Sequence, residues 1–292
     1  MSAPRILGVD AGGTGTRAVL VSDGAVVARF DDGPLNLLLH EDAFERLVLL
    51  IKESGATAAG LGLAGLRGAA EGRALQAKLS AATGADVAIA DDTEVALLGA
   101  FDGGPGIVVI AGTGSNAFGR DAQGRAARVG GHGFLLGDEG SAYWIANTAL
   151  RAALHSHDGT GPKSVALEDA VTAVYGLDFD AIVRLVHTNP ADRQLVARAA
   201  RAVMELDDSV MGKILDDAAQ ALVTMALALR AKLGDDLPVA MHGGIFRNPR
   251  IRDAFVAGTG AVAPAKSPEF GALHLLTTMS GAGHRDEGWT ST

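Results

Sequence analysis

Two glycine turns, each following a short apolar strand, are the parts of the sequence best suited to chemistry. The first lies in residues 5–21, RILGVDAGGTGTRAVLV, where Asp10 closes the strand and Gly12, Gly13 and Gly15 form the turn. Glycines let the chain reverse with its amides turned inward, and crowded amides form a nest for anions. A carboxylate beside such a nest can hold hydrated Mg²⁺ against phosphate groups. The residues therefore predict a phosphate-binding turn at which Asp10 positions a metal ion.

Two better-known glycine motifs do not account for this turn. A Walker loop needs a lysine after its glycines, and none follows here. Residues 13–18 match the looser dinucleotide fingerprint, which opens a helix. Here the apolar run 17–21 is followed by Asp23-Gly24 and a second apolar run, which is the signal of a β-hairpin. We therefore expect the turn to join two strands. A single glycine turn of this kind is more often structural than functional.

The second turn repeats the first at an offset of 99 residues. Strand 106–111, GIVVIA, leads into Gly112-Thr113-Gly114, as the first strand leads into residues 13–15. A repeated strand–turn–strand unit predicts two related lobes. Two such turns placed face to face could hold a nucleoside triphosphate from both sides.

Composition limits the function classes. The chain of 292 residues is 48% hydrophobic, enough for a large core and more than one domain. It has no cysteine, which excludes disulfides and thiolate-bound iron–sulfur clusters. The net charge of −9 argues against nucleic-acid binding, and no apolar run approaches the roughly 18 residues of a membrane span. Residues 1–4 run into the first strand without a basic, apolar leader. We expect a cytoplasmic protein with small-molecule partners and no nucleic-acid or membrane partner.

The order of predicted elements indicates an α/β fold. Three opening strands are followed by alternating helix and strand, as in a lobe with a mixed sheet. The sequence at 102–105, Asp-Gly-Gly-Pro, is a natural boundary, so we expect lobes at 1–104 and 105–292. Residues 164–234 are predicted to be largely helical, with breaks at Asn189-Pro190 and Gly234. The last helix, about 270–281, is apolar enough to pack back on the first lobe.

In the first lobe, Asn36 and Asp92 are candidates with an ordinary alternative each. Asn36 is a lone polar residue among leucines, and a loop asparagine usually satisfies its own backbone. Asp91, with Glu94 three residues later, resembles a capping box that starts a helix. Asp92 is then available for chemistry, although complementing the helix dipole is an equally good interpretation.

In the second lobe, the glycine-rich segment 130–141, GGHGFLLGDEGS, precedes a helix. Asp138 and Ser141 could simply cap that helix. Glycine at five of the twelve positions is more than a cap requires, and indicates a loop pressed against a ligand. Gly243 and Gly244 end a later strand, where they suit either a flat ring lying on the backbone or an ordinary strand-to-helix turn.

In combination and in this order, the motifs VDAGGTGT, AGTGSN, GGHGFLLGDEGSAYW and HGGIF resemble the actin-like sugar-kinase superfamily. More narrowly, the chain resembles the BadF/BadG-type family, which includes N-acetylglucosamine kinase, over nearly its whole length. The resemblance implies two related actin-like, ribonuclease H-like lobes, each with a mixed sheet of the five-stranded type and flanking helices. It also implies a ligand cleft between the lobes.

The resemblance implies an ATP- and Mg²⁺-dependent kinase that phosphorylates the 6-hydroxyl of N-acetylglucosamine. Asp10 would position the magnesium, and Asp92 would be the catalytic base. The substrate contacts would be Asn36, Asp92, Gly131, His132 and Asp138. The nucleotide contacts would be Gly12, Gly13, Thr14, Thr16, Gly112, Thr113, Gly114, Ser115, Gly243 and Gly244. In some relatives a tryptophan stands at the position of His132, and another residue often precedes the catalytic aspartate, so the choice of sugar stays open.

Three other functions can be compared with this interpretation. Glucosamine and N-acetylmuramic acid are alternative substrates for the same site. ATP-driven activators of acyl-CoA dehydratases share the nucleotide turns but carry an iron–sulfur cluster on cysteines, which this chain lacks. A non-enzymatic actin-like protein should lack a substrate loop like 130–141. The family is compatible with a homodimer.

Overall fold

The computed structural model describes residues 3–281, which fall into two compact units. The chain up to Gly104 and the segment from Pro264 onward form the first unit, and Pro105–Ala263 form the second. The sequence analysis places the segment from Pro264 in the second lobe, with a final helix free to pack back. By its contacts, this segment belongs to the first unit.

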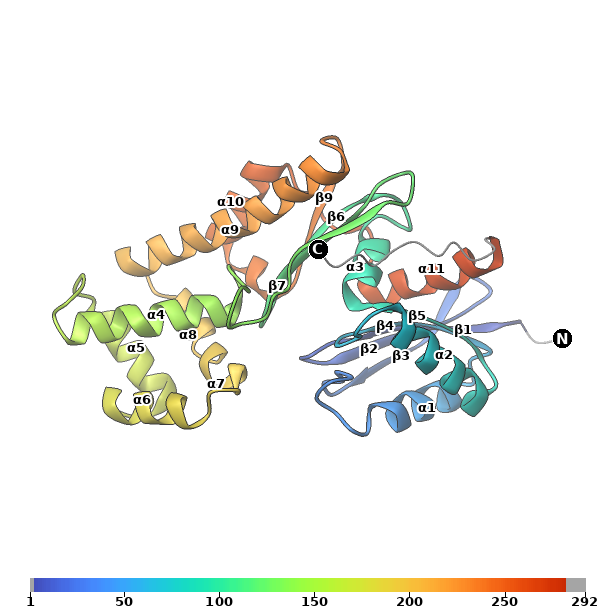
Figure 1. Cartoon of the computed structure of the whole chain (residues 1–292), viewed down its shortest axis with the longest axis horizontal. Helices are drawn as coiled ribbons and strands as arrows, with labels where there is room; N and C mark the ends of the chain where they lie inside the picture. Colours follow the sequence, from blue (N-terminus) through green and yellow to red (C-terminus); the bar gives the residue numbers. More distant parts are fainter. Residues whose placement is uncertain (1–2, 282–292) are drawn as a thin grey trace. The chain divides into compact units, whose positions relative to one another are not determined.

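The first unit is built on a five-stranded sheet in the order β3-β2-β1-β4-β5 (Figure 1). β1 pairs antiparallel with β2 and parallel with β4, and β4 pairs parallel with β5. The turn at Asp23-Gly24 joins β2 to β3 as the hairpin predicted from the sequence, with both residues at positive φ. The strands are β1 (Arg5–Ala11), β2 (Thr16–Ser22), β3 (Ala25–Asp32), β4 (Ala58–Leu63) and β5 (Asp86–Asp91).

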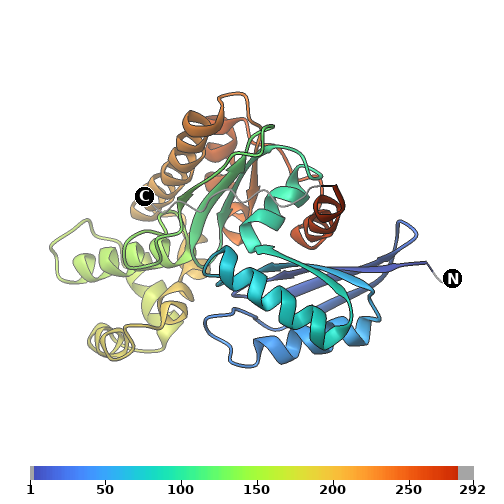
Figure 2. The same ribbon diagram turned by 45° about the vertical axis from the view of Figure 1, so that its right-hand side comes forward.

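Two pairs of helices cover the faces of this sheet (Figure 2). One face carries α1 (Ala43–Ser54) and α2 (Ala69–Thr83), and the other carries α3 (Asp92–Ala100) and α11 (Pro268–Gly281). Gly55 and Gly84 end α1 and α2 in the left-handed conformation, which a glycine adopts without strain.

Glycines bring α11 directly onto the sheet. Gly8 of β1 and Gly60 of β4 are paired in register. A β-carbon on either would collide with the α11 backbone, at the carbonyls of Glu269 and Ala272 respectively. Within α11, Gly271 lies in the same way against the backbone of α3. Glycine in β4 thus marks a close backbone approach, and this packing explains why α11 belongs to the first unit.

The sheet of the second unit has the same strand order as the first sheet, but its fifth strand is reduced to a single bridge. This four-stranded sheet runs β8-β7-β6-β9, where β6 is antiparallel to β7 and parallel to β9. A single parallel bridge from Ala240 to Val262 stands where the first sheet has β5. The predicted fifth strand is therefore only one bridge long, because Pro264 follows at once and cannot donate a ladder hydrogen bond. The strands are β6 (Gly106–Ala111), β7 (Ser115–Arg120), β8 (Ala126–Gly130) and β9 (Val239–His242).

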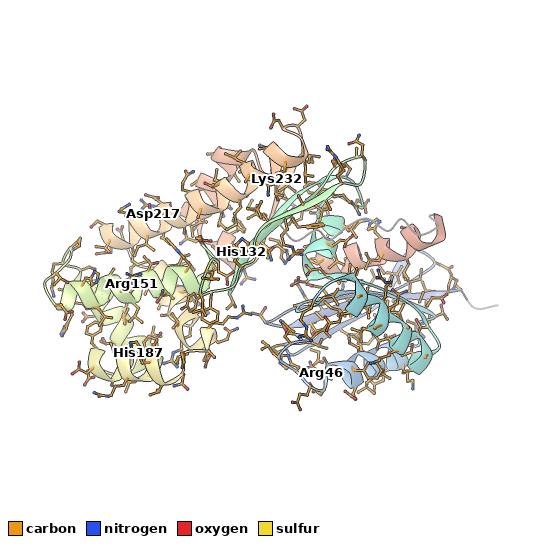
Figure 3. All side chains as sticks on the ribbon, in the orientation of Figure 1. Arg46, His132, Arg151, His187, Asp217 and Lys232 are labelled. Atoms are coloured by element: carbon orange, nitrogen blue, oxygen red, sulfur yellow. The ribbon has the colours of Figure 1, made fainter. Side chains whose placement is uncertain are left out.

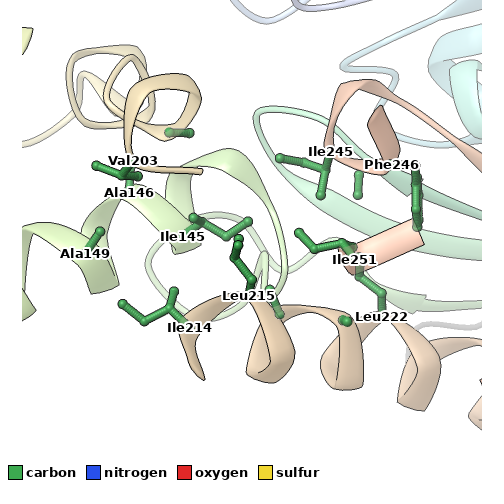
Figure 4. Close-up of a cluster of buried hydrophobic side chains, with 14 of the residues drawn as sticks. Ile145, Ala146, Ala149, Val203, Ile214, Leu215, Leu222, Ile245, Phe246 and Ile251 are labelled. Atoms are coloured by element: carbon green, nitrogen blue, oxygen red, sulfur yellow. The ribbon is translucent and has the colours of Figure 1, made fainter. Parts of the chain in front are cut away.

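Helices supply most of the core of the second unit. The segment 164–234 is helical as predicted, but Gly176 and residues 205–208 break it in addition to the expected places. The long α9 packs on β6, β7 and β8, and its apolar face meets α4 and α10 (Figure 4). The helices are α4 (Ala142–His157), α5 (Val165–Tyr175), α6 (Phe179–Thr188), α7 (Arg193–Ala197), α8 (Ala200–Met204), α9 (Ser209–Leu233) and α10 (Pro249–Thr259), with a 3₁₀ turn at Gly244–Arg247.

Candidate functional site

Three parallel strands of the first unit end level with one another. Ala11, Leu63 and Asp91 are partners across β1, β4 and β5, so the segments that follow these strands leave the same edge of the sheet. In open α/β sheets, ligands bind outside the carboxyl ends of such strands. The first glycine turn follows β1 at this edge, and Asp92 follows β5. Asn36 joins them through a parallel bridge to Ala64, the residue after β4.

The first turn is held at its ends and open at its tip. The Gly12 amide donates to the Gly15 carbonyl at 3.0 Å, and the Gly12 carbonyl accepts from Leu35 at 3.1 Å. After the turn, the buried Thr16 hydroxyl donates to the Gly33 carbonyl at 2.9 Å. The tip amides, those of Gly13 and Thr14, donate to no acceptor within residues 3–281. The turn thus presents two unused amide donors on an anchored backbone, which suits an anion.

The reason for glycine in this turn differs from the one predicted. Gly12 and Gly15 have ordinary negative-φ backbone, and an added β-carbon would find only normal contacts at 3.5 and 3.6 Å. The protein's own packing therefore does not require glycine at these two positions. The space left by the missing side chains is available to a ligand.

Asp10 stands beside the turn as an ion-paired, mostly buried carboxylate. It lies opposite Arg17 in the β1–β2 register, and an Arg17 guanidinium nitrogen donates to its Oδ2 at 3.0 Å. Burial raises the pKa of Asp10 to about 6, against the lowering effect of Arg17, and the nearby Glu269 charge adds to the rise. A carboxylate that is costly to keep charged gains from a cation, so the position fits a metal-positioning role. The sequence analysis did not anticipate the Arg17 pair.

Asp91 and Asp92 divide their roles as the sequence predicts. Asp91 is the N-cap of α3, and its Oδ1 accepts from the Thr93 amide at 2.9 Å and the Thr93 hydroxyl at 2.5 Å. Asp92 is the first helical residue, is half-buried, and does not serve as the cap. Its role as a base stays a prediction.

Asn36 behaves locally as a turn asparagine. Its Oδ1 accepts from the Leu38 amide at 2.9 Å, which is the ordinary alternative stated above. Its side-chain NH₂ group makes no hydrogen bond within the described part of the chain. Two donors therefore stay available to a ligand, and a sugar contact is compatible with the local bond.

The second turn follows β6 and is shorter by one residue. Ala111 pairs with Ser115, whereas Ala11 pairs with Thr16 across the first turn. The Gly112 amide donates to the Gly114 carbonyl at 2.9 Å. Over residues 3–281, the amides of Thr113 and Gly114 find no acceptor. This turn also presents two unused amides, which matches the phosphate-binding role predicted from the repeat.

The predicted sugar loop, residues 130–141, is attached to this turn. The Gly131 amide donates to the Ser115 carbonyl at 3.2 Å, and the Ser115 hydroxyl donates to the Glu139 carbonyl at 2.7 Å. The Ser115 amide donates to Asp138 Oδ1, also at 3.2 Å. The structure therefore brings Gly131 and Asp138 together at the second turn. His132 lies on the same loop with an exposed side chain (Figure 3).

Asp138 has three unusual properties. It is 4% exposed, its backbone has a positive φ of 61°, and its Oδ2 has no hydrogen-bond partner among the described residues. Burial raises the pKa of its carboxyl, against the Ser115 amide and the positive charge of Arg193. A buried acceptor without a partner and a strained backbone are features of ligand sites.

The sequence analysis assigned no role to Asn116, although the structure marks it. Its Oδ1 is buried without a hydrogen-bond partner among the described residues. Other atoms of Asn116 lie next to the positions where β-carbons of Gly130 and Gly131 would stand. The repeat carried a signal for it, because Asn116 stands opposite Ile110 as Arg17 stands opposite Asp10.

Position 243 is a glycine for a structural reason that the sequence did not reveal. Its φ is 109°, and a β-carbon there would collide with Ala111 at the end of β6. This contact brings the end of β9 to the second turn. Gly244 has open space where a side chain would be. An adenosine contact at the pair stays a prediction.

The described residues contain no cluster of three or more His, Asp or Glu side chains that could hold a metal. No helix in residues 3–281 is long and apolar enough to cross a bilayer.

Two relatives with known names are both amino-sugar kinases. The chain is 31% identical to an N-acetylmuramic acid/N-acetylglucosamine kinase of Clostridium acetobutylicum over 168 residues, 56% of this chain and 55% of that protein. It is 32% identical to an N-acetyl-D-glucosamine kinase of Dictyostelium discoideum over 155 residues, 48% and 46% of the two chains. The chain thus matches about half the length of each of these relatives.

A solved structure from Chromobacterium violaceum, provisionally assigned as an N-acetylglucosamine kinase, resembles the whole fold. Its TM-score is 0.81 at 30% identity, over 94% of this chain and all of that one. Residues 7–269 match the family model of the BadF/BadG/BcrA/BcrD ATPases. With both glycine turns, the repeated sheet order and this match across most of its length, the chain belongs to the BadF/BadG/BcrA/BcrD ATPase family.

Proposed function

We propose that the protein is an ATP-dependent amino-sugar kinase that transfers the γ-phosphoryl group to the 6-hydroxyl of N-acetylglucosamine. The observation that carries the proposal is the pair of anchored turns, each with two unused backbone amides. Such amides stabilise phosphate oxygens without any charged side chain. The names of the relatives from Clostridium and Dictyostelium support the amino sugar. Glucosamine and N-acetylmuramic acid are the alternative substrates.

In this proposal both turns bind the phosphates of one ATP. Gly12, Gly13, Thr14 and Thr16 serve the first turn, residues 112–115 serve the second, and the glycine pair at 243–244 contacts adenosine. Asp10 is a buried carboxylate near the end of the strand before the first turn, and Mg²⁺ in nucleotide sites takes one or two carboxylates together with phosphates and waters. When bound, the ion neutralises charge on the phosphates. Asp10 would orient it, at the expense of the Arg17 pair.

Sugar binding is assigned to polar groups that have no hydrogen-bond partner among residues 3–281. Asp138 Oδ2 accepts from a sugar hydroxyl, and the Asn36 NH₂ group donates to another. The loop backbone at Gly131 and the exposed His132 complete the contacts. Asp92 accepts the proton of the attacking hydroxyl. A positioned base of this kind contributes about 10²–10⁴-fold to the rate.

The experiment is a coupled ATPase screen over hexoses and amino sugars with Asp92→Asn beside the wild type. We expect turnover to depend on an amino sugar, and Asp92→Asn to lose about 10²–10⁴-fold while nucleotide affinity stays unchanged. Asp42→Asn is the matched control, because Asp42 precedes α1 as an exposed acid and makes no side-chain cap bond. A loss under about tenfold would remove Asp92 from the mechanism.

A non-enzymatic actin-like protein is the competing function. It predicts slow ATP turnover that no sugar changes. The same screen separates the two, because a kinase consumes one ATP for each sugar phosphorylated. ATP turnover that is indifferent to every sugar would contradict the proposed function.

A further inference from the structure

The two carboxylate oxygens of Asp138 have different surroundings in the second unit. Its Oδ1 accepts from the Ser115 amide, which directly follows the second glycine turn. Its Oδ2 is buried and has no partner among the described residues. One carboxylate therefore holds the turn with one oxygen and leaves the other for a ligand. The two oxygens belong to the same resonance-stabilised group, so a change at one affects the other.

Five hydrogen bonds tie the predicted sugar loop and its helix to the turn. In one, the Gly131 amide donates to the Ser115 carbonyl. Two come from Ser115, to Asp138 Oδ1 and to the Glu139 carbonyl. The other two come from the first amides of α4. Ala142 donates to the Gly112 carbonyl at 2.8 Å, and Tyr143 donates to the Thr113 carbonyl at 3.2 Å. The carbonyls of Gly112 and Thr113 are therefore fixed by the helix, while the amides of Thr113 and Gly114 make no hydrogen bond among the described residues.

Gly114 shows how closely the carboxylate and the turn are fitted. A β-carbon at this position would stand 2.8 Å from Asp138 Oδ2 and 3.0 Å from its Cγ and Oδ1. Gly112, two residues earlier, has nothing within 4 Å of the same position. The glycine at 114 is thus required by the Asp138 carboxylate, whereas the glycine at 112 is not required by the protein itself.

We infer that Asp138 is a positioning residue for the second glycine turn, through which sugar binding and nucleotide binding strengthen each other. The inference rests on the proposed function, since it assigns the sugar to Asp138 Oδ2 and the nucleotide to the Thr113 and Gly114 amides. A sugar hydroxyl at Oδ2 fixes the carboxylate in place and stabilises its charge. Oδ1 is then held where it accepts from the Ser115 amide, and a hydrogen bond to an ionised acceptor is stronger than one to a neutral acceptor.

The hydrogen bond from the Ser115 amide to Asp138 is long enough to become shorter and stronger. The Ser115–Asp138 bond is 3.2 Å, at the long end of the normal range for an amide donor. Holding the turn rigid before the phosphates arrive lowers the cost of binding them. Coupling between two sites is typically 5–150-fold in affinity and acts equally in both directions.

The test measures the affinity of Mg²⁺ with AMP-PNP, a non-hydrolysable ATP analogue, by calorimetry with and without saturating N-acetylglucosamine. We expect the sugar to raise the wild-type affinity at least about fivefold, and the analogue to raise sugar affinity by the same factor. Gly114→Ala displaces the carboxylate from the Ser115 amide, so its coupling factor should fall below about twofold.

Asp121→Asn is the matched control, because Asp121 is also buried at an end of β7. Its carboxylate accepts from the Gln123 and Arg125 amides at 3.0 and 2.8 Å, but it does not contact the turn. Its coupling factor should equal that of the wild type. Asp138→Asn keeps an acceptor for the Ser115 amide without the charge, and should weaken the coupling.

A second measurement uses only the wild type, in case Gly114→Ala does not fold. N-acetylglucosamine alone, without nucleotide, should slow hydrogen exchange in residues 112–116 and leave residues 121–125 unchanged. Exchange in 112–116 that ignores the sugar, or a Gly114→Ala protein with full coupling, overturns the inference. If the wild type binds both ligands independently, the inference fails while sugar phosphorylation stands. If no sugar is phosphorylated, the proposed function itself fails.

Discussion

The two glycine turns of this protein share a local plan but depend on different support. In each, a buried alanine ends the first strand, at Ala11 and Ala111, and a buried hydroxyl begins the next strand. Both hydroxyls donate to a backbone carbonyl of a later segment, Thr16 to Gly33 and Ser115 to Glu139. The tip amides are unused in both turns, within residues 3–281.

The two turns differ in the residue that precedes each alanine and in the groups that hydrogen-bond to the turn. Asp10 in the first unit corresponds to Ile110 in the second, and both positions are half-buried between fully buried neighbours. The first turn thus has a carboxylate on the strand before it, paired with Arg17, and the second has an isoleucine at that position. The second turn instead has the α4 amides and Asp138 behind it. A repeated turn can therefore take a metal-positioning role in one copy and a ligand-coupling role in the other.

The largest expected effect comes from removing the carboxylate that distinguishes the first turn. Asp10→Ala should lower kcat/KM about 100-fold or more and raise the Mg²⁺ concentration needed for half-maximal activity, because it removes the carboxylate proposed to position the ion. Mg²⁺ titrations of turnover measure both. Ile110→Val, at the corresponding position, should lose less than about 1.5 kcal/mol of stability and keep the wild-type Mg²⁺ titration. An unchanged titration for Asp10→Ala would count against the metal role.

The same carboxylate should make stability depend on pH. Its pKa is about 6 in the folded protein against an ordinary 3.8, so the folded state binds more protons between these values. Stability should therefore fall as pH rises from about 4 to about 6 and then stay level. Without metal, Asp10→Asn should be more stable than the wild type at pH 7.5, by at most about 3 kcal/mol, and equal to it near pH 3. Urea unfolding at both values decides this, and equal stability at pH 7.5 would contradict it.

A matched pair of glycine substitutions asks whether both turns hold the nucleotide. Gly12→Ala and Gly112→Ala add methyl groups that meet only ordinary contact or open space in the protein. Each variant should keep its unfolding free energy within about 1 kcal/mol of the wild type. Each should bind ATP about tenfold more weakly, a loss of about 1.4 kcal/mol, because the methyl group enters the phosphate space. If only one variant loses affinity, the other turn is structural.

The smallest expected effect concerns the buried hydroxyl that both turns have in common. Thr16→Val and Ser115→Ala each remove a buried hydroxyl and the hydrogen bond that it donates to a backbone carbonyl. Each should cost about 1 kcal/mol of unfolding free energy in urea, with similar values for the two. A cost near zero at one site would show that the two hydroxyls are not equivalent.

Local patterns predicted the elements that depend on nearby residues. The Asp23-Gly24 hairpin and the Asp91 cap follow from rules that act within a few residues. The same rules predicted the repeat and hence two related sheets. The five-stranded type that the resemblance implied is complete in the first sheet, whereas the fifth position of the second sheet is a single bridge beside β9, shortly before Pro264.

The sequence by itself determined the two strand–turn–strand units, the α/β class and the residue types at the candidate site. The tertiary structure decided which of those residues act on one another. The Asp10–Arg17 pair, the Asp138 bond to Ser115 and the placement of α11 in the first unit all join segments that are distant in sequence or meet only across a sheet. The pKa of a buried carboxylate has the same origin, since burial and neighbouring charges are properties of the packed chain and not of any local pattern.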